Sequence, residues 1–133
     1  MEKFYPHLGI KLRRKLFMFR DNDIQNLENI LWAISKIETS LKDVESSLGL
    51  DTNEEKYDPI IIKLMNIGES AKNLTADIKD NNPSIDWKGM YNLRNIISHT
   101  YHNLDVDIVW DIVKNELPVN KKQIEEIYLN IKI

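Results

Sequence analysis

The chain has 133 residues and 42% of them are hydrophobic, which suits the core of one domain. Cysteine is absent, and this excludes disulfides and thiolate metal sites. Six of the 18 Lys and Arg residues but only one of the 21 Asp and Glu residues lie in residues 1–20. The remaining body is therefore acidic, which argues against a broad nucleic-acid groove but leaves room for a local phosphate site.

No apolar run approaches the roughly 20 residues that span a bilayer. No secretory leader is recognisable at the N-terminus, because an apolar core and a small-residue cleavage site are both missing. We therefore expect a soluble cytoplasmic protein, with neither a membrane nor DNA as its partner.

Residues 1–18 are predicted to be an N-terminal extension of a helical domain that covers residues 19–133. Aromatic and Leu residues alternate with Lys and Arg near this end of the chain. The composition fits an amphipathic segment packed on the domain, and it also fits a flexible basic arm. Adhesion to a membrane surface is the weakest interpretation, because the segment is short.

Apolar residues at a spacing of 3.6 predict a first long helix over residues 21–48, with Leu48 on its buried face. Asp21 or Asn22 would cap this helix and Gly49 would end it. The same spacing predicts a second helix that starts at residue 53 or 54 and continues to residue 79.

A break at residues 81–84 precedes a short third helix, predicted over residues 87–101 and capped by Asp86. A final helix is predicted over residues 105–131, with Ile108 facing inward. Pro118 should kink or divide that helix, because proline lacks the N–H and its ring clashes with the preceding turn. Short connectors between helices of this length predict an all-α, antiparallel bundle of four to five helices.

The stretch from Arg94 to Tyr101, Arg-Asn-Ile-Ile-Ser-His-Thr-Tyr, concentrates the reactive side chains of the chain. Arg94 is the only arginine after Arg20, and every other basic residue beyond that point is Lys. A planar guanidinium with five donors suits a phosphate. His99 can move protons near neutral pH.

RNA cleavage without a metal needs a base for the 2′-hydroxyl proton, a cation for the charge that builds on phosphorus, and an acid for the leaving 5′-oxygen. Arg94 and His99 supply two of these roles. Five positions place them about 140° apart on a helix. Arg94 would therefore meet His99 around the helix, through a loosened helix end, or from a second subunit.

One chain offers a single strong His, so we expect a two-fold homodimer whose interface holds two copies of Arg94 and of His99. Asn95 is four positions before His99 and would share its helix face. Three scattered His residues and no Cys predict no metal site.

Each candidate also has a purely structural interpretation. Arg94 could pair with an acidic residue of a neighbouring helix, and His99 could be a hydrogen-bonded core histidine. Glu69 follows Gly68, which would let another helix approach closely. The carboxylate of Glu69 could then contact and orient Arg94, or it could be an exposed helix acid.

The motif and its surroundings resemble the HEPN superfamily, specifically its HepT-like toxins. The resemblance depends on Arg, four residues, His, one residue and Tyr, which reads without gaps from Arg94 through His99 to Tyr101. Residues 85–87 and 103–105 on either side also match, as do residues 19–21 and 67–69. The resemblance therefore covers about residues 19–133.

This resemblance implies a dimeric HEPN bundle that acts as a metal-independent endoribonuclease without a cofactor. The enzyme would be the toxin of a type VII toxin–antitoxin pair and would cleave transfer or messenger RNA. Arg94 and His99 would be catalytic with the support of Asn95, and Glu69 and Ser98 are further candidates for supporting residues.

An MntA-like nucleotidyltransferase antitoxin would neutralise such a toxin by transferring AMP from ATP to the motif tyrosine, here Tyr101. AMP beside Arg94 and His99 would fill the phosphate site and add negative charge. The structural alternative for Tyr101 is an aromatic ring packed at the helix end. The functional alternative for the whole chain is a non-catalytic HEPN module that binds a nucleotidyltransferase.

Overall fold

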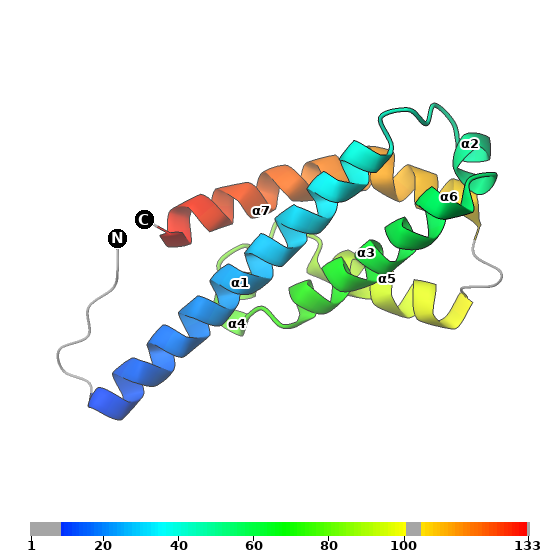
Figure 1. Cartoon of the computed structure of the whole chain (residues 1–133). Helices are drawn as coiled ribbons and strands as arrows, with labels where there is room; N and C mark the ends of the chain where they lie inside the picture. Colours follow the sequence, from blue (N-terminus) through cyan, green and yellow to red (C-terminus); the bar gives the residue numbers. More distant parts are fainter. Residues whose placement is uncertain (1–8, 101–104, 133) are drawn as a thin grey trace.

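The computed structural model describes residues 9–100 and 105–132, with the backbone alone for residues 10–19, 96–100 and 132. The described chain is all-α, and its direction alternates along the four longest helices (Figure 1). In chain order the elements are α1 (Ile10–Ser40), α2 (Ser47–Asp51), α3 (Glu54–Lys72), α4 (Ala76–Asp80), α5 (Trp87–Thr100), α6 (Val106–Asp111), the π-helical turn η2 (Ile112–Glu116) and α7 (Leu117–Lys132). The predicted all-α bundle is confirmed.

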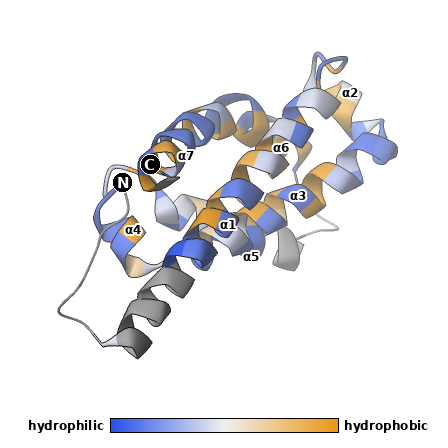
Figure 2. Cartoon of the chain, turned by 60° about the vertical axis from the view of Figure 1, so that its left-hand side comes forward, coloured by the Kyte–Doolittle hydropathy of each residue, from blue (hydrophilic) through white to orange (hydrophobic). Residues whose placement is uncertain are grey.

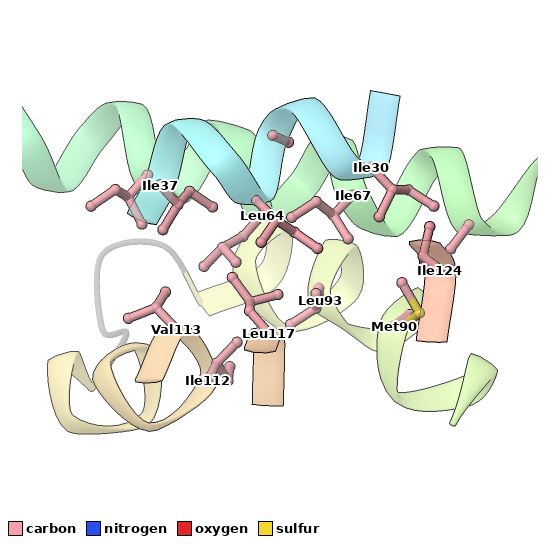
Figure 3. Close-up of a cluster of buried hydrophobic side chains, with 14 of the residues drawn as sticks. Ile30, Ile37, Leu64, Ile67, Met90, Leu93, Ile112, Val113, Leu117 and Ile124 are labelled. Carbon is pink, nitrogen blue, oxygen red and sulfur yellow. The ribbon is translucent and has the colours of Figure 1, made fainter. Parts of the chain in front are cut away.

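One hydrophobic core holds the bundle together, and α3 contributes to it both where it faces α1 and where it faces α5. This helix packs most extensively on α5 and on α1. Figure 3 shows apolar side chains from these helices, η2 and the start of α7 meeting in a single cluster. The labelled members, all of them buried, are Ile30, Ile37, Leu64, Ile67, Met90, Leu93, Ile112, Val113, Leu117 and Ile124.

The helices combine apolar and polar residues, as their alternating colours show (Figure 2). The side chains of Asn53, Asp86 and Asp105 cap α3, α5 and α6, each by accepting a hydrogen bond from a backbone N–H two or three positions later. The cap predicted at Asp86 is therefore confirmed. Within residues 9–100 and 105–132, no helix combines the length and the hydropathy needed to cross a membrane.

α1 begins earlier than predicted, at Ile10. Asp21 and Asn22 lie inside the helix, so the prediction that one of them caps it is wrong. The backbone is helical across residue 18, where the extension was predicted to meet the domain. That division stays a prediction. Arg20 donates a hydrogen bond from Nη2 to the backbone carbonyl of Ile131, which ties α1 to the end of α7.

The predicted first helix is in fact two helices, because residues 41–46 leave the helical path. Ser46 then caps α2 by accepting a hydrogen bond from the backbone N–H of Gly49, which lies inside α2 and does not end a helix. Leu48 is 69% exposed, so its predicted burial is wrong. The apolar spacing misled because residues of the connection, such as Leu41, are still buried.

The predicted second helix is also divided. α3 ends at Lys72 and α4 begins at Ala76. Between them, Thr75 donates two hydrogen bonds to the buried carboxylate of Asp23 in α1, from its backbone N–H at 2.9 Å and from its hydroxyl at 2.6 Å. This contact from α1 fixes the chain at the point where α4 starts.

The final helix is interrupted just before Pro118, as predicted. The π-helical turn η2 precedes α7, and its wider path accommodates the proline ring and the missing N–H. Val109 is buried whereas Ile108 is exposed, so the prediction that Ile108 faces the core is wrong. The π turn contains an additional residue, which shifts the buried face between α6 and α7.

Candidate active site

α5 presents Arg94 and Asn95 to solvent because its opposite face is buried. Met90 and Leu93 belong to the core (Figure 3), and the two residues that follow Leu93 are exposed. The candidate site therefore lies on a helix whose orientation is fixed by packing. A site on a packed helix is held more precisely than a site on a loop.

Gly68 brings α3 and α5 unusually close. A Cβ atom at Gly68 would lie 3.0 Å from the backbone nitrogen of Arg94 and 3.0 Å from the backbone oxygen of Met90. Both atoms belong to the backbone of α5 and cannot rotate away, so the absence of a side chain permits this approach. The close approach expected at Gly68 is present, and it occurs at Arg94.

The next residue of α3, Glu69, forms an ion pair with Arg94. Glu69 Oε2 lies 3.0 Å from Arg94 Nη1, and the two side chains are 45% and 46% exposed. Oε2 itself is buried, and the contact does not have the angles of a hydrogen bond. Exposed pairs of this kind add little to stability, so the main effect is positional. The guanidinium is held beside α3 with most of its five N–H donors left for another anion.

The backbone of α5 remains helical to Thr100, which includes Ser98 and His99. No loosening of the helix separates Arg94 from His99, so two of the three expected routes remain: reach around the helix, or contribution from a second subunit. The side chains of Ser98 and His99 and the whole of Tyr101 lie outside the described residues. Their roles stay predictions.

A hollow of about 250 Å³ lies between α1 and α3, and Glu69 forms part of its wall. We call it the α1–α3 pocket. Its lining residues are Asn29, Trp32, Ala33, Asn66, Glu69 and Ser70. Each helix contributes positions i, i+3 and i+4, which form one helix face. The sequence prediction missed this pocket, although Trp32 gave a signal as a large aromatic residue outside the apolar stripe.

Fold and site together define a class, an all-α bundle whose α5 carries an exposed Arg94 on the same helix as His99. The chain matches the family model described as Ribonuclease HepT-like over residues 30–127. It therefore belongs to this ribonuclease family, as the motif predicted. Among the described residues, no group of three His, Cys, Asp or Glu side chains could hold a metal ion.

Curated relatives agree with the family. The chain is 32% identical over 101 residues to "Probable ribonuclease HepT" of Thermococcus cleftensis, covering 76% of this chain and 91% of the relative. It is 31% identical over 99 residues to "Putative RNase MJ1380" of Methanocaldococcus jannaschii, covering 74% and 90%. A further relative from that organism, "Putative RNase MJ0127", is 42% identical over 73 residues, which are 55% of this chain and 60% of the relative. No solved structure matches the chain.

Proposed function

We propose that this chain is a metal-independent endoribonuclease and the toxin of a toxin–antitoxin pair. The observation that carries the proposal is the placement of Arg94. Arg94, the only arginine after Arg20, is exposed on the helix that also holds His99, and it is oriented by Glu69. Membership of a ribonuclease family and relatives named as ribonucleases support the same reaction class.

In the proposed reaction, the 2′-oxygen of RNA attacks the adjacent phosphorus while the bond to the 5′-oxygen breaks. The 2′-hydroxyl proton leaves to a base and the 5′-oxygen receives a proton from an acid, so the products are a 2′,3′-cyclic phosphate and a 5′-hydroxyl. His99 serves as base or acid. Arg94 stabilises the charge on the phosphorane, because its planar donors match two phosphate oxygens. Asn95 supports the pair.

A homodimer completes this site. The helical backbone between Arg94 and His99 keeps the two positions on different faces of α5. Two-fold pairing would place Arg94 of one subunit beside His99 of its partner. The interface would then hold two such Arg94–His99 pairs, each assembled from both chains, and two His99 side chains to act as base and acid.

The experiment follows from this arrangement. Arg94→Ala and His99→Ala should each abolish growth arrest and RNA cleavage while the protein stays folded by circular dichroism. A heterodimer of Arg94→Ala with His99→Ala, purified through two different tags, retains one intact Arg94–His99 pair and should recover part of the wild-type activity. Folded single variants with full activity would refute the proposed catalytic roles, and an inactive heterodimer would refute the shared site.

Neutralisation is proposed to occur at Tyr101, by AMP transfer from an MntA-like nucleotidyltransferase. AMP on this tyrosine would place a phosphate near Arg94 and His99 and would compete with RNA for the guanidinium. Co-expression with a nucleotidyltransferase encoded next to this chain should add the mass of one or more AMP units. The added mass should be absent from Tyr101→Phe.

A further inference from the structure

The α1–α3 pocket has the size needed for a planar ring. Its base is formed by small side chains, since Ala33 and Ser70 are both buried. Trp32 is 56% exposed and offers an aromatic surface at the same place. An apolar cavity of roughly 150 Å³ accepts benzene, so a pocket of about 250 Å³ has room for a two-ring heterocycle.

The remaining lining side chains are hydrogen-bonding groups. Asn29 and Asn66 each bring a carboxamide with two N–H donors and one acceptor, and Glu69 brings a carboxylate with about four lone-pair sites. Arg94 occupies one side of that carboxylate. Unstacked RNA bases are recognised in this way, by an aromatic surface and by polar groups on the base edge.

The carboxylate selects among the bases. Glu69 Oε2 is buried against Arg94, so Oε1 is the oxygen left for a ligand. Guanine alone has two adjacent N–H donors on its Watson–Crick edge, N1–H and the N2 amino group, and both can converge on this one oxygen. The O6 of guanine accepts, and a carboxamide N–H of Asn29 or Asn66 can donate to it. Adenine, cytosine and uracil each present only one N–H donor group on that edge.

The charges next to the pocket suit a nucleotide better than a neutral ring. Glu69 lines the pocket and also pairs with Arg94, so only the side chain of Glu69 separates a base in the pocket from the guanidinium. Lys36 adds a second cation, with Nζ 5.9 Å from the centre of the Trp32 ring. One cation therefore lies beside the carboxylate and another beside the Trp32 ring, and either is suited to attract the phosphate of a bound nucleotide.

We propose that the α1–α3 pocket binds a guanine base of the RNA, stacked on Trp32 and held at its Watson–Crick edge by Glu69, while Arg94 binds a neighbouring phosphate. This inference rests on the proposed ribonuclease function and deepens it, because it gives the enzyme a preference for cleaving near a guanosine. Glu69 then has two roles, orienting Arg94 and reading the base.

Direct binding tests the pocket without any cleavage. Titrating the protein with GMP should quench the fluorescence of Trp32. The Kd of GMP should lie at least about tenfold below those of AMP, CMP and UMP, as expected when two donors of one base are recognised. Trp32→Phe should lose the response. Trp110→Phe is the matched control, because Trp110 also lies under a lysine, with Lys114 Nζ 4.7 Å from its ring centre, and it should keep the response.

Two further variants separate the base from the phosphate. Glu69→Gln should bring the four nucleotides to within about threefold of one another, whereas Glu38→Gln, the same change at another interhelical ion pair, should not. Arg94→Ala should weaken GMP but leave guanosine unchanged, since guanosine has no phosphate. Equal Kd values for all four nucleotides, or quenching that survives in Trp32→Phe, would overturn the proposal.

The pocket and the proposed ribonuclease function can fail separately. Guanine-selective binding by a protein that cuts no RNA supports the pocket and rejects the ribonuclease. RNA cleavage by a protein without guanine preference, in binding or in the sequence of its cut sites, supports the ribonuclease and rejects the pocket. If Trp32→Ala converts a dimer into monomers, the pocket is covered by the second copy and the proposal fails.

Discussion

Two helix junctions in this protein are held by an ion pair of the same length and differ in almost everything else. Between α1 and α7, Lys121 Nζ donates to Glu38 Oε2 at 3.0 Å. Between α3 and α5, Arg94 Nη1 lies 3.0 Å from Glu69 Oε2. The first pair is a hydrogen-bonded contact of a flexible lysine. The second joins a planar guanidinium to a carboxylate that also lines a pocket.

The difference lies in what surrounds each pair. At the α3–α5 junction, Gly68 lets the helices approach until a Cβ would touch the backbone of α5, and the pair is the more exposed of the two. Side chains that rest on a fixed backbone and face open solvent are the arrangement expected of a binding site. A point-charge contact between two helices is the arrangement expected of a structural tie.

The largest effect is expected at Arg94. Arg94→Lys keeps the charge but loses the planar fork, and RNA cleavage should fall by about 10²-fold or more. The unfolding free energy should change by less than about 0.5 kcal/mol, because the side chain is exposed. Lys121→Arg, the mirror change at the other junction, should leave both quantities unaltered. Comparable loss of cleavage in the two variants would remove the distinction between the junctions.

A buried polar contact should exceed either ion pair in its effect on stability. Asp23 accepts two hydrogen bonds from Thr75 and is almost fully buried. Asp23→Ala leaves the Thr75 N–H without its partner, and the unfolding free energy should fall by about 2–3 kcal/mol in urea titrations. A change below the scatter of the measurement would mean that water replaces the carboxylate at no cost.

Gly68→Ala should lower the unfolding free energy by about 1 kcal/mol. The new methyl group would press on backbone atoms of Arg94 and Met90, at an overpacking cost that exceeds the gain of up to about 1 kcal/mol from alanine in a helix. Gly49→Ala is the control, since its Cβ would meet only side-chain atoms at 3.5 and 3.6 Å. That variant should be neutral or slightly stabilised. Two stabilised variants would show that α3 and α5 can separate freely.

The ion pair between α1 and α7 should contribute less. Glu38→Gln should reduce the unfolding free energy by at most about 1 kcal/mol, and the loss should shrink as salt is added. The melting temperature at low and high ionic strength measures both. A larger loss that salt does not change would indicate a contact far less accessible to solvent than the structure shows.

The smallest effect is expected at Glu116, whose pKa is raised by burial, and further by the negative charges of Asp111 and Asp86. Because of this raised pKa, Glu116 stabilises the fold at pH values below the ordinary pKa of a glutamate. That stability is lost as the pH rises through the pKa of Glu116 in the folded protein. Glu116→Gln should therefore melt at a higher temperature than the wild type at pH 7.5, and the difference should vanish near pH 4. If the difference in melting temperature grew as the pH was lowered, the pKa of Glu116 would be lowered by folding and not raised.

Much of the fold could be predicted because apolar spacing reports burial directly. The stripes in α1 and α3 meet in the core. The cap at Asp86 begins α5 as predicted, and α6 begins next to Asp105, where a helix start was expected. The spacing could not report helix ends. Leu41 and Leu74 are buried from turns, so the pattern continued where the helices had stopped. The division before α4 depends on Asp23, 52 residues away, and such a contact leaves no local trace.

The candidate site was partly predictable for a similar reason. Gly68 predicted the close approach of another helix, and a contact between Glu69 and Arg94 was one of the two interpretations of that acid. The approach and the ion pair are both present. The α1–α3 pocket was not foreseen, because its two walls lie on separate helices and only their packing brings Trp32 to Asn66. The predicted roles of His99 and Tyr101 still depend on the motif.

The π-helical turn ahead of Pro118 gives the bundle one position where chain length is adjustable. A π turn is an α turn with one residue inserted, so a chain one residue shorter between Asp111 and Leu117, with a non-proline residue at position 118, would close an ordinary turn there. α6 and α7 would keep their present faces toward the other helices. Single-residue insertions and deletions accumulated over evolution could therefore be absorbed at this point, whereas the same change next to Gly68 would rotate Glu69 away from α5.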